Sequence, residues 1–193
     1  SVPALDRLAT IVRGADTARL DLAPEAAGRD VLVSAQTGSG KTVAFGLAAG
    51  GSLLGEAETF GPADAPLALA IAPTRELALQ VARELGWLYA GAEIATCVGG
   101  MDARKEARAL NFGVHIVVGT PGRLKDHIER ENLDLSALKV LVLDEADEML
   151  DMGFREDLEF ILEQSPPERR TLLFSATIAR EIATLAKRYQ RDA

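Results

Sequence analysis

The sequence has a single cysteine and no apolar run long enough to span a membrane. Cys97 alone excludes an internal disulfide framework and is typical of a reducing compartment, so we expect a cytoplasmic protein. No His or Lys stands beside it, which favours a small buried residue over a nucleophile. The chain opens without a secretory leader, and no membrane partner is expected.

Basic charge is also in deficit. A formal net charge of −8 argues against a broad phosphate-binding surface, because phosphate neutralisation supplies most of the affinity of nonspecific nucleic-acid binders. Any nucleic-acid role must therefore be argued from motifs, and it would be weak or dependent on a nucleotide. At 193 residues, 48% of them hydrophobic, the chain fits one domain over 1–193, expected to be monomeric.

Short apolar runs alternate with longer helical patterns along the chain. This alternation predicts an α/β fold, a mostly parallel sheet with helices on both faces, and ligands of such sheets bind beyond the carboxyl ends of the strands. A Gly-, Ala- and Pro-rich stretch over 51–66 predicts an exposed connection. The expected strands are 31–34, 67–72, 94–98, 114–118, 140–143 and 171–174; expected helices begin near 41 and at 74, and occupy 103–110, 122–130, 154–164 and 180–190.

A phosphate-binding loop is indicated between the first strand and helix. The segment AQTGSGKT matches G-x-x-x-x-G-K-[ST], except that Ala35 replaces the first Gly. Lys41 is placed to meet the β- and γ-phosphates, and the Thr42 hydroxyl to ligate Mg²⁺. The alternative, a Gly-rich turn with a chance lysine, is disfavoured by the strand–loop–helix context. The expected nucleotide-binding residues are Ala35, Gln36, Thr37, Gly38, Ser39, Gly40, Lys41 and Thr42.

An apolar strand runs directly into a group of carboxylates, in the sequence VLVLDEAD. Asp144 at the strand tip can hold Mg²⁺ through a water, and Glu145 can orient or deprotonate an attacking water. With Lys41 these are the expected catalytic residues. An acidic helix start would explain Asp147 alone, but not Asp144 and Glu145 beside a phosphate site.

Six ordered motifs resemble those of the DEAD-box RNA helicases. They are AQTGSGKT (35–42), PTREL (73–77), GG (99–100), TPGR (120–123), DEAD (144–147) and SAT (175–177). The resemblance covers about 28–189 and implies the first RecA-like domain of a superfamily-two helicase core, using ATP and Mg²⁺. It implies nonspecific contacts to the RNA backbone from Pro73, Thr74, Arg75, Gly99, Gly100, Thr120, Pro121, Gly122 and Arg123, and coupling through Asp147, Ser175 and Thr177.

Simpler explanations exist for several of these residues. Thr74 can be a helix N-cap, Pro121 a first-turn helix residue, and Arg75 half of a surface ion pair. The two histidines are interpreted as structural: His115, inside an apolar strand, as a core residue and His127 as a solvated helix residue.

Two features depart from the family pattern. The family's adenine-recognising Gln lies upstream of the phosphate loop, but Gln36 is the first Gln here, no aromatic residue precedes Phe45, and segment 1–27 does not resemble that motif. The chain also ends at Ala193, without the second RecA-like domain that supplies the family's arginine finger. Alone it is expected to bind nucleotide, hydrolyse ATP very slowly and unwind nothing, since a missing finger costs on the order of 10³–10⁵ in rate.

Two other functions remain open at this point. One is a DNA-directed helicase or translocase of the same superfamily. The other is a non-catalytic adaptor that binds nucleotide in order to dock RNA or a partner, against which the intact Lys41, Thr42, Asp144 and Glu145 count.

Overall fold

The computed structural model describes residues 31–34, 60–177 and 179–190. The phosphate loop over 35–42, the helix expected from Lys41, segment 1–27 and most of the expected connection 51–66 lie outside the described residues. Within the described ranges, none of the helices combines the length and apolar character that crossing a bilayer requires.

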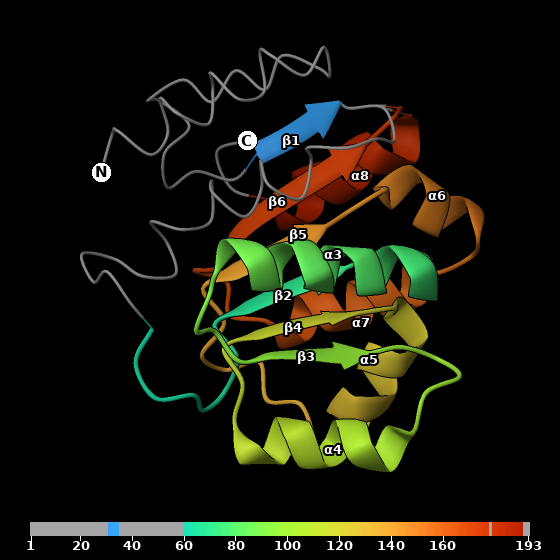
Figure 1. The fold of residues 1–193 in the computed structure, drawn as a ribbon. Coiled ribbons are helices and arrows are strands. Elements are labelled where there is room, and N and C mark those ends of the chain that lie inside the picture. The colour runs from blue at the N-terminus through green and yellow to red at the C-terminus, as the bar shows by residue number, and fades with distance from the viewer. Residues whose placement is uncertain (1–30, 35–59, 178, 191–193) are drawn as a thin grey trace.

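The centre of the described structure is a parallel sheet, as the alternating pattern predicts (Figure 1). Its strand order is β1-β6-β5-β2-β4-β3, and every pairing between neighbours is parallel. Every residue of the four interior strands is buried, as is typical of parallel strands that are covered on both faces. The strands are β1 (Val31–Ser34), β2 (Ala68–Ile71), β3 (Ile94–Cys97), β4 (Ile116–Gly119), β5 (Val140–Leu143) and β6 (Arg170–Ser175).

The helices fall on the two faces of this sheet (Figure 1). On β2, Ala68 and Ala70 belong to the core that α3 covers, while Leu69 and Ile71 point to the opposite face and contribute to a second core with α4–α8. The described helices are α3 (Arg75–Leu88), α4 (Ala103–Phe112), α5 (Pro121–Glu129), α6 (Ala146–Asp151), α7 (Arg155–Gln164) and α8 (Arg180–Tyr189).

One expectation about the first half of the sheet was wrong in detail. Strand β4 begins at Ile116 rather than Val114, because Val114 instead forms an isolated antiparallel bridge with Asp64. The described end of the expected exposed connection is also partly covered: Pro66 is buried, and the Phe60 ring lies 4.8 Å from the His115 ring. His115 itself is a core residue as expected, with Nδ1 accepting from the Glu93 N–H at 2.8 Å.

Candidate functional site at the carboxyl edge of the sheet

The predicted motifs converge on one edge of the sheet. All six strands are parallel, so all of their carboxyl ends lie at the same edge, and a motif follows each strand. In spatial order, β1 leads to the phosphate-loop sequence, β6 to SAT, β5 to DEAD, β2 to PTREL, β4 to TPGR and β3 to GG. The proposed nucleotide residues therefore belong to one end of this edge and the proposed RNA residues to the other.

The carboxylates after β5 are held at the start of α6. Asp144 and Glu145 are each only 6% exposed, and the Asp144 N–H donates to the Ile71 carbonyl of the neighbouring strand at 2.9 Å. Glu145 has a left-handed backbone (φ 53°, ψ 51°), a conformation that costs a non-glycine residue on the order of 1–3 kcal/mol. The strain turns the chain sharply from strand into helix and keeps two successive carboxylates at the strand tip. Their chemistry, hard oxygens at a strand end, suits Mg²⁺ and water.

Strand β6 is tied to this segment by Asp147. The Thr177 hydroxyl donates to Asp147 Oδ2 at 3.1 Å and the Thr177 N–H to the same oxygen at 3.2 Å. The buried Ser175 hydroxyl donates to the Thr177 carbonyl at 2.7 Å, which closes the turn. Burial alone would raise the pKa of Asp147, but hydrogen bonds from the backbone of Glu148 and from Thr177 outweigh it and hold that pKa below its ordinary value.

A tight turn follows β3 at the other end of the edge. The Met101 N–H donates to the Val98 carbonyl at 3.4 Å, and Gly100 has φ +82°, as the third residue of a type II turn requires. Both glycines are exposed. A Cβ on Gly100 would lie 3.1 Å from Arg75 Nη1, so the Arg75 guanidinium packs directly over the turn.

The second arginine of the predicted RNA residues contacts the same turn. Arg123 Nη1 donates to the Met101 carbonyl at 3.2 Å and to Glu106 Oε1 at 2.8 Å. Arg75 and Arg123 thus flank one exposed backbone turn although they are 48 positions apart in number. The structure therefore brings PTREL, GG and TPGR together.

The remaining predicted RNA residues are mainly part of the framework. Thr74 is the N-cap of α3, its Oγ1 accepting from the Leu77 N–H at 3.3 Å, as the simpler explanation held. Pro121 opens α5 and is buried, as is Pro73, so neither ring is available to a ligand. Thr120 makes no capping hydrogen bond, and Gly122 is exposed. For Arg75, no ion pair is found within the described residues.

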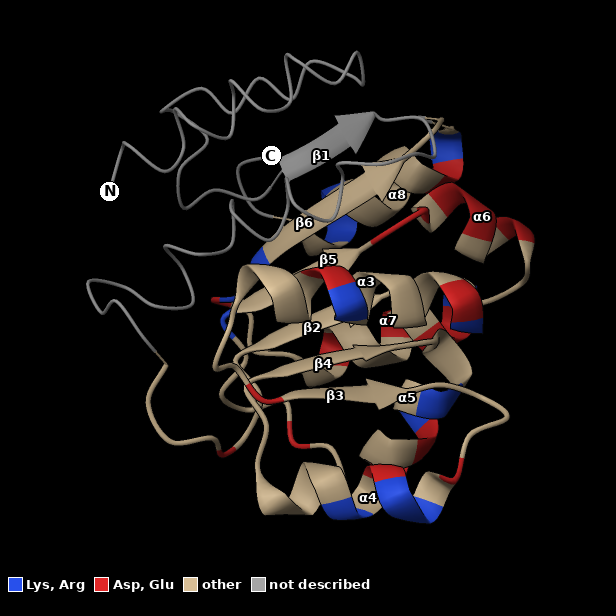
Figure 2. Cartoon of the chain, viewed as in Figure 1, with Lys and Arg blue, Asp and Glu red and all other residues tan. Residues whose placement is uncertain are grey.

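Figure 2 shows acidic residues at the end of β5 and on α6, and a basic residue at the start of α5. The acidic end carries Asp144, Glu145 and Asp147, whereas the described turn after β3 lies between two arginines. The net charge of −8 therefore does not describe each end of the edge.

Sequence reasoning missed Glu106 and misplaced His127. His127, expected in solvent, is 1% exposed, because α5 turns the face that carries Leu124 and His127 inward. The buried Glu106 of α4 is its hydrogen-bond partner. A signal was available for both residues: Glu106 stands four before the buried Leu110, and His127 three after the buried Leu124.

A parallel sheet with a phosphate-loop sequence after its first strand and paired carboxylates after an interior strand defines the class of α/β nucleoside-triphosphate-binding domains. The chain belongs to the DEAD/DEAH box helicase family, whose profile matches residues 19–185.

Individual relatives support this membership. The chain is 44% identical over 174 residues to DEAD-box ATP-dependent RNA helicase 9 of Oryza sativa subsp. japonica, covering 90% of this chain and 28% of the relative. It is 47% identical over 169 residues to DEAD-box ATP-dependent RNA helicase CshA of Bacillus licheniformis, covering 86% and 33%. It thus spans about a third of the length of these curated relatives.

Two solved structures of DEAD-box proteins share the fold of this chain. A DEAD box protein from the hyperthermophile Methanococcus jannaschii superposes with a TM-score of 0.75 at 43% identity, over 85% of this chain and 44% of that one. The yeast DEAD-box splicing factor Prp28 gives a TM-score of 0.75 at 35% identity, over 84% and 40%.

Proposed function

We propose that this chain is the nucleotide-binding half of an ATP-dependent RNA helicase, a single RecA-like domain that acts with a second one in a cytoplasmic protein. The observation that carries the proposal is the placement of the five described motifs, in spatial order, at one edge of the sheet, with the phosphate-loop sequence directly following β1 in the chain. A nucleotide bound at one end and RNA at the other can then be coupled through contacts along that edge.

At the nucleotide end, Lys41 and the other residues of 35–42 would bind the phosphates of ATP, and Thr42 and Asp144 would hold Mg²⁺. Bound Mg²⁺ supplies charge neutralisation on the β- and γ-phosphates. Glu145 orients the attacking water and accepts its proton. The burial of both carboxylates beside a strand tip supports this assignment, because displaced solvent strengthens their interaction with charged ligands.

At the RNA end, Arg75, Arg123, the Thr120 hydroxyl and the exposed N–H groups at Gly99, Gly100 and Gly122 bind phosphates and sugars. Guanidinium, hydroxyl and backbone N–H groups suit phosphates and sugars rather than base edges, and such contacts carry no sequence information, so the binding is nonspecific in sequence. The Asp147–Thr177 contact lies between the two ends and transmits the state of the nucleotide site.

The adenine pocket is tested on the chain itself. Calorimetric titration with Mg-ADP and Mg-GDP, with Lys41→Ala as the control, is expected to show tighter ADP binding that the substitution abolishes. Equal affinity for the two nucleotides would contradict an adenine-specific site.

The enzymatic assignment is tested on the whole protein that contains this chain. RNA is expected to stimulate its ATP hydrolysis more than DNA of the same length does, and Glu145→Gln is expected to abolish that hydrolysis. Stimulation by DNA alone would favour a DNA-directed motor. An adaptor would be favoured if the wild-type protein showed no RNA-stimulated ATP hydrolysis and Glu145→Gln left its RNA binding unchanged.

A further inference from the structure

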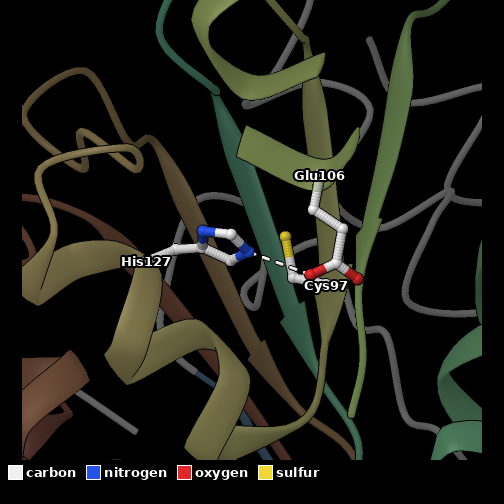
Figure 3. A group of neighbouring side chains, drawn as sticks. All are labelled: Cys97, Glu106 and His127. Atoms are coloured by element: carbon white, nitrogen blue, oxygen red, sulfur yellow. Dashed lines mark hydrogen bonds and ion pairs between the residues drawn. The ribbon is translucent and has the colours of Figure 1, made fainter. Parts of the chain in front are cut away.

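A buried cluster of Cys97, Glu106 and His127 lies behind the proposed RNA residues (Figure 3). Potential ligand atoms of the three residues lie within 4.8 Å of one another, which on distance alone would suit a metal ion. They come from the end of β3, from α4 and from α5.

The hydrogen bonds of Glu106 argue against a metal ion in this cluster. Oε1 accepts from Arg123 Nη1 at 2.8 Å and from His127 Nε2 at 2.9 Å, and Oε2 accepts from the Val98 N–H at 3.0 Å. Burial, with Glu106 adding to it, raises the pKa of the Cys97 thiol to about 12, so the thiol stays protonated. Both oxygens of Glu106 already accept hydrogen bonds and a guanidinium lies beside them, so we interpret this carboxylate as a hydrogen-bond acceptor and not as a metal ligand.

Those bonds connect Glu106 to both ends of the turn after β3. It binds the Val98 N–H, where the turn begins, directly. It reaches the Met101 carbonyl, where the turn ends, through Arg123 Nη1, which donates to both groups. A single buried carboxylate therefore fixes the exposed Gly99–Gly100 backbone and the arginine beside it.

The charge of the cluster is balanced by the same residues. Glu106 and Arg123 form an ion pair, and the His127 ring lies between two polar partners, with Nε2 2.9 Å from Glu106 Oε1 and Nδ1 3.3 Å from Asn132 Nδ2. Among the described residues no acceptor is paired with Nη2 or Nε of Arg123. Holding Nη1 from behind leaves these donors for a ligand.

We propose that Glu106 is a positioning residue for RNA binding, which holds Arg123 and the Gly99–Gly100 turn in one arrangement. The inference rests on the proposed function. Ordering a long arginine side chain and a glycine turn costs conformational entropy. In a preorganised site this entropy is lost on folding, so it does not weaken the binding of RNA.

The test is a double-mutant cycle on the whole protein, with a fluorescein-labelled oligouridylate and a non-hydrolysable ATP analogue, read by fluorescence anisotropy. Both Glu106 oxygens accept hydrogen bonds, so the amide NH₂ of Glu106→Gln faces a donor in either orientation of the side chain. Glu106→Gln and Arg123→Ala are each expected to weaken RNA binding roughly tenfold. The loss in the double variant is expected to be smaller than the product of the two single losses, because Glu106 acts in part through Arg123. ATP-analogue affinity serves as a check on general damage and is expected to be unchanged.

Two further variants complete the design. Arg123→Lys keeps the charge but cannot donate to Glu106 and Met101 while offering a planar fork outward, so it is expected to weaken RNA binding nearly as much as Arg123→Ala. This variant also leaves Glu106 in place, so the test survives if Glu106→Gln does not fold. Glu129→Gln, on the exposed side of the same α5, is the matched control and is expected to bind like the wild type.

The outcomes separate the two proposals. Suppose that the wild-type protein binds the oligouridylate. The positioning role would then be overturned if Glu106→Gln or Arg123→Lys bound RNA as tightly as the wild type, or if the two single losses multiplied in the double variant. Each of these outcomes would leave the proposed function standing. A wild-type protein that does not bind the oligouridylate would overturn both.

Discussion

The contact between Asp147 and Thr177 can be removed with little change in shape by Thr177→Val. The substitution deletes one donor to a carboxylate and keeps the Thr177 N–H bond to the same oxygen. A hydrogen bond to a charged group contributes about 1.5–3 kcal/mol when well shielded, but Thr177 is exposed, so we expect a loss of about 1 kcal/mol in the free energy of unfolding at pH 7.

The pH dependence of that loss identifies its cause. Asp147 has a lowered pKa in the folded chain, so its contribution to stability is present above the unfolded-state pKa and disappears as pH falls through the folded-state pKa. Thr177→Val raises the folded-state pKa towards the ordinary value. The stability gap between wild type and variant should therefore be widest near neutral pH and should close in acid.

Urea unfolding at several pH values measures the gap, and carboxyl NMR of Asp147 measures its pKa directly. Thr184→Val is the matched control, because the Thr184 hydroxyl donates to the Arg180 carbonyl within its own helix. It should leave the pKa of Asp147 unchanged. A gap for Thr177→Val that stays constant from pH 7 into acid, or an unmoved Asp147 pKa, would refute the reasoning.

Two more outcomes follow from the packing. Gly119→Ala would place a Cβ 2.5 Å from the Cys97 carbonyl oxygen and 2.8 Å from Leu124, and is expected to lower the free energy of unfolding by about 1–3 kcal/mol; Gly86→Ala, with its nearest neighbour 3.8 Å away inside α3, should instead raise it by roughly 0.5–1 kcal/mol. Urea unfolding separates the two, and equal effects would contradict the contact argument. Cys97, fully buried and with a pKa raised by its burial to about 12, should resist iodoacetamide at pH 8 until urea unfolds the chain; rapid labelling of the folded chain would contradict that.

The sequence predicts the sheet well because its strands are continuous apolar runs, and such runs have few alternatives in an alternating α/β chain. Helix α6 was not predicted. It has six residues, begins at a strained Glu145 without a side-chain cap, and is too short to show a period.

The candidate site was predicted unevenly. Motif spacing placed Asp144 directly after a strand, and in the structure it follows β5, while Arg123 lies in the first turn of α5, which follows β4. Glu106 and His127 are bonded across 21 positions, and local periodicity could show only that each faces inward. A buried carboxylate interrupts the apolar pattern of a helix. Its burial is explained only by its hydrogen-bond partners, which lie on other elements and cannot be identified from local sequence.

The deficit of basic charge is compatible with the proposed RNA binding if the arginines contribute oriented hydrogen-bond donors rather than net positive charge. Glu106 cancels the charge of Arg123, so this pair adds little long-range attraction for phosphate. What it offers instead is an oriented set of donors beside two exposed glycines. Affinity obtained from geometry is short-ranged and is lost when the geometry changes. The proposed function requires RNA to be released in each ATP cycle, and such a surface would suit that release, whereas a broad basic face would hold RNA in every nucleotide state.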